Sequence, residues 1–197
     1  MRALQEWVAS KVWGSLPERR ERGLKRMYDV LAQTAFHNRY WMNGGLLLGC
    51  IREGGPLKND TDADFSFWAE DKPYFEEAIQ ALRSAGFKLG RAKPNKDGSI
   101  TKWAFKSQVM KYEFYQMDRV GDKMCWLSHA RKLGLEMTNE VPLHGLSTIE
   151  LFGRTWLKPD DHETYLESLY GNWRVPNPGY CYWKDSQAVV SRYPWKD

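Results

Sequence analysis

The chain has 197 residues, a formal charge of +4 and 42% hydrophobic residues. This length and composition predict one domain with a substantial core and exclude a chain that is disordered throughout. No uncharged apolar stretch approaches the roughly 18 residues of a membrane-spanning helix, and residues 1–13 lack the uninterrupted apolar core of a secretion signal.

The first part of the chain is predicted to alternate helices and strands. Residues 18–36 have apolar side chains at helical spacing, and the short aromatic segment 37–42 is typical of a strand. Residues 46–52 are apolar and end at the Gly-Gly-Pro of 54–56, which indicates a short buried helix. Residues 62–68 alternate acidic or small residues with apolar ones, as a half-buried strand does.

The second part begins with a helix predicted over 73–85. Two strand-like segments follow, at 100–106 and 109–118. Near the C-terminus, Asp160 and Glu163 have the spacing of a capping box, which predicts the start of another helix. A tail rich in aromatic residues and proline follows that helix.

This order of elements predicts a mixed α/β (α+β) fold rather than a helical bundle or a β-sandwich. No internal repeat and no long Pro/Gly/Ser linker divides the chain, so we expect a single domain over residues 1–197. Within it, residues 1–36 are expected to form an N-terminal helical segment. Residues 172–197 are expected to form an aromatic tail that packs on the domain.

An acidic run stands at the start of the strand predicted over 62–68. Side chains two positions apart on a strand point to the same face, so Asp62 and Asp64 should project together, and Asp60 joins them if the strand starts early. Clustered carboxylates raise one another's pKa unless a cation lies between them, and hard oxygen ligands suit Mg²⁺ or Mn²⁺. Because Asp-x-Asp is a common string, a solvated acidic turn remains the alternative.

A glycine pair upstream makes the acidic run more specific. Gly44 and Gly45 let the backbone approach a phosphate closely and present N–H groups to it at the start of a helix. A glycine pair that opens a helix, followed by an Asp-x-Asp strand, resembles the nucleotidyltransferase fold, in which a third carboxylate from a neighbouring strand completes a metal site. Glu113 is the predicted third acid. Asp118 is the alternative, although it lies close to a predicted turn.

Two separated motifs in the chain resemble the LicD/fukutin family. The first is GGLLLGCIREGG at 44–55, with the acidic run that follows it. The second is LFGRTWLKP at 151–159, followed by YL at 165–166 and YGNWRVP at 170–176. The two motifs occur in the family's order across residues 40–176, which is more specific than either motif alone.

The resemblance implies an enzyme that moves a phospho-substituent from a nucleotide diphosphate donor to a hydroxyl of a glycan or lipid-linked sugar. Donors of known relatives are CDP-linked, such as CDP-choline or CDP-ribitol. The resemblance also implies that Asp62, Asp64 and Glu113 bind Mg²⁺ or Mn²⁺, with Asp60 as a further catalytic acid beside them. Family members often have three consecutive acids before the final Asp, whereas this chain has Thr61 within the run. Glu113 stands where Asp is more usual.

Basic residues around the glycine pair are candidates for holding the donor. Gly44 and Gly45 are expected to bind the diphosphate through backbone N–H groups. Arg52 follows the glycine-opened helix, where it could hydrogen-bond donor phosphates or form a salt bridge to a nearby acid. The same alternatives apply to Lys58.

The tail contains a second group of candidate binding residues. Trp173 and Arg174 are predicted to bind substrate, because aromatic and cationic side chains can wall a sugar or a quaternary ammonium group. A tail that is only packed on the core is the alternative. The group continues with Tyr180, Tyr182 and Trp183.

Two other functions remain open from the sequence. One is a nucleotidyltransferase that adds a nucleoside monophosphate to a small hydroxylated molecule, and the other is a non-catalytic glycan-binding module. Nucleic-acid binding is not expected, because basic residues form no stripe with aromatic ones. The three widely spaced cysteines form no CxxC pair, which favours a reducing compartment. We therefore expect a cytoplasmic protein with at most peripheral membrane contact.

Overall fold

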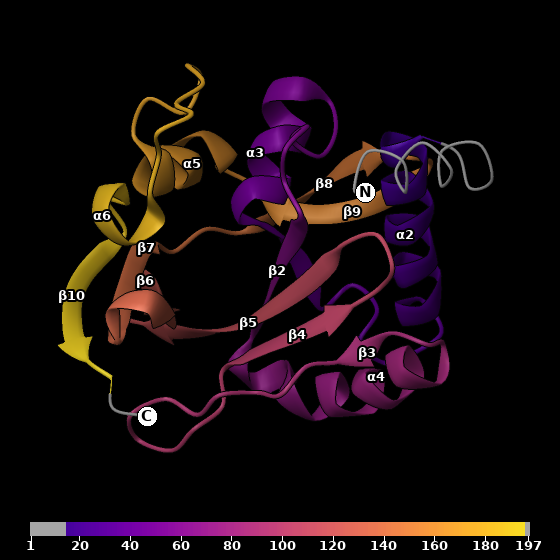
Figure 1. Cartoon of the computed structure of the whole chain (residues 1–197), viewed down its shortest axis with the longest axis horizontal. Coiled ribbons are helices and arrows are strands. Elements are labelled where there is room, and N and C mark those ends of the chain that lie inside the picture. The colour runs from indigo at the N-terminus through magenta and orange to yellow at the C-terminus, as the bar shows by residue number, and fades with distance from the viewer. Residues whose placement is uncertain (1–14, 196–197) are drawn as a thin grey trace, which may run out of the picture.

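The computed structural model of the chain describes residues 15–195. Residues 1–14 and 196–197 lie outside the described residues, and so does the expectation that residues 1–13 are not a secretion signal. The fold is a mixed sheet flanked by helices, which confirms the predicted mixed α/β class (Figure 1). Within residues 15–195, none of the helices combines the length and the apolar composition needed to cross a bilayer.

The helices and strands have the following bounds. The strands are β1 (Tyr40–Asn43), β2 (Asp62–Trp68), β3 (Lys88–Leu89), β4 (Lys102–Lys106), β5 (Lys111–Val120), β6 (Lys123–Ala130), β7 (Leu135–Pro142), β8 (Leu146–Leu151), β9 (Arg154–Pro159) and β10 (Val189–Pro194). The α-helices are α2 (Leu16–Leu31), α3 (Gly44–Glu53), α4 (Lys72–Ser84), α5 (His162–Tyr170) and α6 (Tyr182–Asp185). Short 3₁₀ turns are η1 (Ala69–Asp71) and η2 (Arg131–Leu133).

The sheet divides at β5. The strand order is β10-β7-β6-β5-β2-β1-β9-β8, and β4 pairs with β5 as well as with β3. Residues 111–117 of β5 pair in parallel with β2, whereas residues 118–120 pair with β6. The strands β6, β7 and β10 therefore form an arm that extends from the main part of the sheet (Figure 1).

The core lies on the face of the main sheet that α2 and α4 cover. Side chains alternate along a strand, so Phe65 and Phe67 of β2 point to this face. Phe65 stacks on Phe114 of β5 with ring centroids 5.3 Å apart, and Phe67 stacks on Phe75 of α4 at 4.6 Å. The opposite face of β2 and β5 is left for polar side chains, as the Asp-x-Asp pattern predicts.

Several boundaries differ from the sequence predictions by one to five residues. The first helix begins at Leu16, because Ser15 forms a capping box with Glu18, and it ends at Leu31, so residues 32–39 form turns rather than more helix. The strand predicted over 37–42 begins at Tyr40 accordingly. The N-cap of α5 is Asp161 rather than Asp160, and its carboxylate accepts a hydrogen bond from the Thr164 N–H at 3.1 Å.

The tail is part of the sheet rather than only an addition to its surface. Its strand β10 pairs with β7 and forms the outer edge of the arm. Trp173, near the start of the tail, is buried in the main core. The short helix α6 lies between these two attachments, so the tail crosses from α5 to the arm.

Candidate active site

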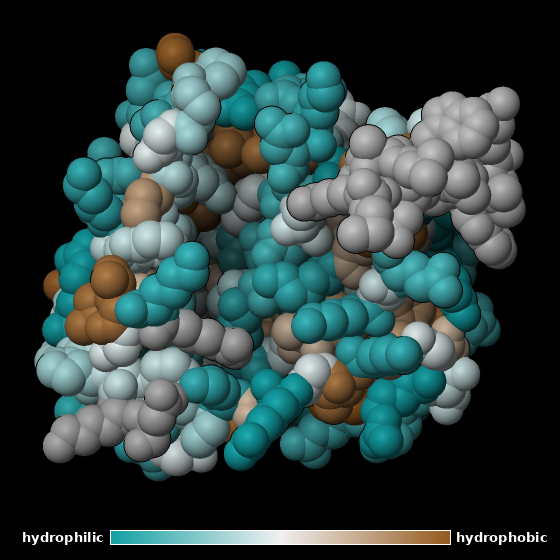
Figure 2. Space-filling model, in the orientation of Figure 1, coloured by the Kyte–Doolittle hydropathy of each residue, from teal (hydrophilic) through white to brown (hydrophobic). Residues whose placement is uncertain are grey.

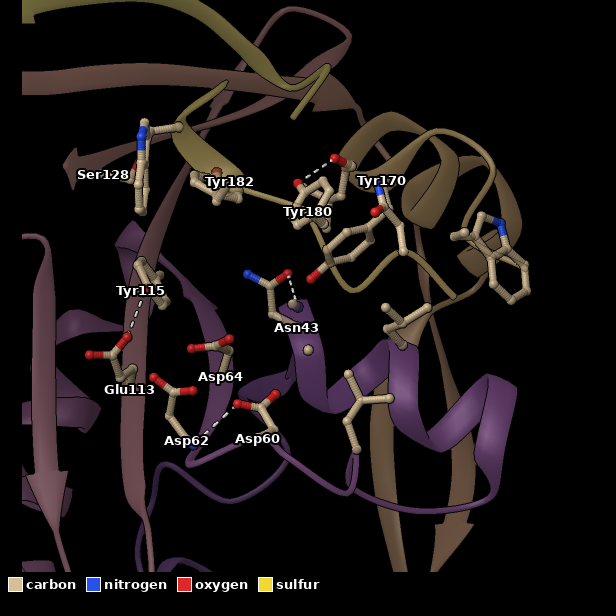
Figure 3. A pocket seen from close by; sticks show the side chains of 18 of the residues that line it. Asn43, Asp60, Asp62, Asp64, Glu113, Tyr115, Ser128, Tyr170, Tyr180 and Tyr182 are labelled. Carbon is tan, nitrogen blue, oxygen red and sulfur yellow. Dashed lines mark hydrogen bonds between the residues drawn. The ribbon is translucent and has the colours of Figure 1, made fainter. Parts of the chain in front are cut away.

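A cavity of about 660 Å³ lies between α3, the polar face of the main sheet, the arm and the tail. Its volume is within the range of pockets that bind small molecules. One end is lined by carboxylates and the other by aromatic rings (Figure 3). On the face of the molecule seen in Figure 2, mostly hydrophilic residues cover the surface.

Asp62, Asp64 and Glu113 converge at the acidic end. Asp64 of β2 is the direct partner of Glu113 in the parallel β2–β5 pairing, and Asp62 lies two residues away on the same face. One carboxylate oxygen from each of the three residues lies within 4.8 Å of the others. The parallel register thus brings together the three acids that the sequence singled out (Figure 3).

Asp60 lies two residues before the start of β2 and also lines the cavity. Its Oδ1 accepts a hydrogen bond from the Asp62 N–H at 3.4 Å. The segment that carries it is held by Arg20 of α2, which donates to the carbonyls of Leu57 and Lys58 at 3.2 and 2.9 Å and to the Asp60 carbonyl. A buried arginine on the first helix therefore positions the acid that precedes the strand.

The glycine pair allows these acids to pack against the start of α3. Gly44 has a positive φ of 54°, and a Cβ atom on it would lie 2.5 Å from Asp64 Oδ2. A Cβ atom on Gly45 would collide with the Asp60 carboxylate. Any larger residue would push the carboxylates away from the helix N-terminus, where backbone N–H groups and the helix dipole favour negative charge.

Asn43 connects the two sequence motifs. As the N-cap of α3, its Oδ1 accepts hydrogen bonds from the Gly44 N–H at 2.6 Å and from the Tyr165 hydroxyl at 2.7 Å. Its Nδ2 donates to Ser66 Oγ of β2 at 2.8 Å. The tyrosine of the second motif thus reaches across from α5 to the glycine segment of the first.

Two lysines neutralise the acids. Lys111 Nζ lies 2.7 Å from Asp62 Oδ2 and 2.9 Å from Glu113 Oε1. Lys102 Nζ, from β4, lies 2.7 Å from the other oxygen of Glu113. The Tyr115 hydroxyl donates to Glu113 Oε2 at 2.9 Å. Glu113 is therefore almost fully paired, whereas Asp64 has no lysine at this range among residues 15–195.

The four acids of the cavity differ in the direction in which their pKa values are shifted. Burial raises the pKa of Asp64 well above its usual range, and the negative charges of Glu113 and Asp62 add to this effect. Burial and the contact with Asp62 raise the pKa of Asp60 to about 6. Burial also opposes ionisation of Asp62 and Glu113, but their pKa values are lowered because hydrogen bonds and nearby lysine charges outweigh it.

The raised pKa of Asp60 predicts how its substitution changes stability with pH. An acid whose pKa is higher in the folded than in the unfolded state stabilises the fold at pH values below the pKa of the unfolded state, near 4. This contribution is lost as the pH rises through the folded-state pKa of about 6. Asp60→Asn should therefore unfold a few degrees above wild type at pH 7.5. Each kcal/mol added to the free energy of unfolding raises the unfolding temperature of a domain of this size by about 2–4 °C. The difference should vanish near pH 4. Thermal unfolding with a chelator present measures it, and a constant difference at all pH values contradicts the assignment.

The other predicted binding residues divide between the cavity and the surface. Arg52 lines the cavity, and its guanidinium donates to the Trp173 carbonyl at 3.0 Å and to Glu53 Oε1 at 2.9 Å. Trp173 lines the cavity from the tail. Among the described residues, Lys58 and Arg174 are not part of the lining: Lys58 is exposed, and Arg174 pairs with Glu163 at 2.8 Å.

Aromatic side chains form the end of the cavity opposite the acids. Tyr170 of α5 points into the cavity, and Tyr180 and Tyr182 of the tail lie beside it (Figure 3). Their ring positions are held by hydrogen bonds, because the Tyr180 hydroxyl donates to the Leu169 carbonyl at 2.9 Å and the Tyr182 hydroxyl to Asn139 Oδ1 at 2.7 Å. Flat, fixed rings of this kind can stack on a sugar or a nucleobase.

Sequence reasoning missed several residues of the cavity. Lys111 and Tyr115 lie two positions either side of Glu113, so the strand period alone would place them on its face. Lys102 could not be found in this way, because its position depends on the register between β4 and β5. Asp118, the alternative third acid, lies beyond the part of β5 that pairs with β2 and is exposed.

The donor set fits a divalent metal ion. All three converging residues offer carboxylate oxygens, which Mg²⁺ and Mn²⁺ prefer. Burial, and then the negative charges of Glu113 and Asp62, raise the pKa of Asp64, so a cation at this place would be stabilising. Together with a glycine-opened helix beside carboxylates on two parallel strands, this arrangement is typical of a nucleotidyltransferase-type domain. The chain belongs to the LicD/FKTN/FKRP family, because the family model for the nucleotidyltransferase domain matches residues 37–161.

Individual proteins are similar to the chain at low sequence identity. The chain is 27% identical over 165 residues to the ribitol 5-phosphate transferase FKRP of Homo sapiens, and equally to that of Mus musculus. The match covers 78% of this chain and 32% of each mammalian protein, so the chain spans about a third of their length. Among solved structures, a lincosamide antibiotic adenylyltransferase, LnuA, is similar with a TM-score of 0.45 and 16% identity, over 72% of this chain and 83% of LnuA.

Proposed function

We propose that the protein is a metal-dependent transferase that moves a substituted phosphate group from a CDP-linked donor to a hydroxyl group of a glycan. The observation that supports this most is the convergence of Asp62, Asp64 and Glu113 at the base of a cavity in a LicD-family domain. The relative named as a ribitol 5-phosphate transferase favours a phospho-alcohol over a nucleotide as the transferred group.

The residues have separate roles in this proposal. Asp62, Asp64 and Glu113 hold Mg²⁺ or Mn²⁺, which when bound supplies positive charge next to the donor diphosphate. The N-terminus of α3 presents backbone N–H groups to the same phosphates, since Gly44 and Gly45 allow close approach. Phosphoryl transfer depends mainly on positioning and charge neutralisation, which these groups provide.

The acceptor hydroxyl needs a group that removes its proton. Asp60 faces the cavity beside the three converging acids without being one of them, so we assign it the role of general base. The aromatic end, with Tyr170, Tyr180 and Tyr182, lies opposite the acids and would hold the sugar or polyol by stacking. Arg52 fixes Trp173 through its carbonyl and faces the same cavity, where it can contact the diphosphate.

Donor preference tests the first half of this proposal. We expect CDP to bind more tightly than UDP, GDP or ADP, because the family resemblance points to CDP-linked donors. Mg²⁺ should strengthen the binding of all four, since the helix N-terminus and the metal act on the diphosphate whatever the base. Calorimetry with the four diphosphates measures this, and thermal unfolding provides a second measurement, since a ligand at 100 times its Kd adds about 2.7 kcal/mol of stability. Equal affinity for all four, or preference for a purine, contradicts a CDP-linked donor.

The mass of the product tests the second half. With CDP-choline or CDP-ribitol, Mg²⁺ and a panel of glycans, the acceptor should gain the mass of a phospho-alcohol. A gain of nucleoside monophosphate instead would identify a nucleotidyltransferase. If the protein neither binds a divalent ion at the three acids nor transfers any group, it is a non-catalytic binding module.

A further inference from the structure

Lys111 lies between two of the carboxylates assigned to the metal. Its ammonium contacts Asp62 Oδ2 at 2.7 Å and Glu113 Oε1 at 2.9 Å, while these two acids also offer oxygens within 4.8 Å of each other and of Asp64. A divalent ion bound by the same acids competes with this ammonium for their negative charge. The position of Lys111 is therefore that of a built-in counterion.

Lys102 contacts the same cluster in a different way. Its ammonium lies 2.7 Å from Glu113 Oε2 alone, and it also lies over the ring of Tyr115, 4.5 Å from the centroid. The two lysine side chains are similarly exposed, at 27% for Lys102 and 33% for Lys111. Lys102 thus has a second partner away from the metal ligands and provides a matched comparison.

The Lys111 side chain can move without disturbing its strand. The backbone of Lys111 is held between β2 and β4, opposite Asp62 on one side and Lys106 on the other. The side chain lines the cavity, and a lysine carries its charge on a flexible four-carbon stem. An ammonium released from the carboxylates remains within the same cavity, where the donor diphosphate would lie.

We propose that Lys111 is a displaceable counterion. In the metal-free protein it pairs with Asp62 and Glu113, and when a divalent ion and the donor bind, it leaves these carboxylates and binds oxygens of the donor diphosphate. Lys102 remains on Glu113 throughout. The proposal rests on the metal-dependent function proposed above.

Calorimetric titration with Mn²⁺ alone tests the displacement, using wild type, Lys111→Met and Lys102→Met. Lys111→Met should bind Mn²⁺ about tenfold more tightly than wild type, because the competing charge is gone. Lys102→Met should gain clearly less, since Lys102 contacts only one of the three acids, whereas Lys111 contacts two. At saturating Mn²⁺, Lys111→Met should bind CDP about tenfold more weakly than wild type, with unchanged affinity for cytidine, which has no phosphate.

The outcomes separate this proposal from the metal-dependent function. If wild type binds Mn²⁺ but Lys111→Met binds it no more tightly, the role of Lys111 is overturned and the metal site stands. The same holds if Lys111→Met binds CDP as tightly as wild type does. If wild type and both variants fail to bind Mn²⁺, both proposals are overturned.

A measurement on the wild-type protein covers the case in which Lys111→Met does not fold. Modification by an amine-reactive acylating reagent is followed by mass spectrometry, with and without Mn²⁺. The rate at Lys111 should rise severalfold when Mn²⁺ is added, because the amine leaves its two carboxylates, and the rate at Lys102 should stay constant. An unchanged rate at Lys111 overturns the proposal.

Discussion

Asp64→Asn is expected to lower turnover by about three orders of magnitude or more, which corresponds to about 4 kcal/mol of transition-state stabilisation. The side chain is one of the three converging acids and lies against Gly44, and its amide replacement keeps the shape but removes a charged ligand. Asp62→Asn should have a comparable effect. Steady-state transfer assays with Mg²⁺ measure both variants.

The same substitution should leave the fold intact. Burial and the charges of Glu113 and Asp62 raise the pKa of Asp64, so an ionised Asp64 costs stability at neutral pH in the absence of metal. Asp64→Asn should therefore unfold at the same temperature as wild type or higher, with a chelator present at pH 7.5. Asp122→Asn, an exposed acid in the turn after β5, is the control and should change neither quantity. Near-normal turnover in either cluster variant would show that the site is misassigned.

The second large effect is expected at Glu113. Glu113→Gln should lower turnover by about two orders of magnitude or more, because it removes a charged metal ligand and leaves Lys102 and Lys111 without their shared partner. Asp118→Asn is the matched control on the same strand. Its carboxylate is exposed and lies past the pairing with β2, so its loss should change turnover less than twofold.

Divalent-ion affinity separates the role of Glu113 from simple damage to the strand. Calorimetry should show weaker Mn²⁺ binding in Glu113→Gln and wild-type binding in Asp118→Asn. Circular dichroism and thermal unfolding check that β5 is intact in both variants. The reverse pattern, with Asp118→Asn inactive and Glu113→Gln active, would exchange the roles of the two acids.

Local sequence patterns were sufficient to predict the helix and the strand that carry the candidate site. The strand predicted over 62–68 has the observed bounds of β2, and the glycine pair opens α3 as expected. The period of two along a strand is also enough to place Asp62 and Asp64 on one face. These features depend on neighbours within a few residues, which is the range over which side-chain alternation and helix capping act.

Other features depend on the pairing of distant segments. The parallel register of β2 and β5 places Glu113 opposite Asp64 and leaves Asp118 outside, a choice that the β5 sequence alone left open. The contact of Tyr165 with Asn43, 122 residues away, unites the two motifs at one helix N-terminus.

The amino-acid sequence by itself determined the α/β class, the acidic strand and the glycine-opened helix, because each follows from local periodicity and backbone freedom. Only the tertiary structure decided which groups surround the acids. Lys102 reaches Glu113 through the β4–β5 register, Arg20 holds the Asp60 segment from α2, and the tail supplies the aromatic wall by pairing β10 with β7. These contacts join segments far apart in the chain. The free energy that selects such a pairing comes from both segments packed together, so neither segment's sequence alone predicts it.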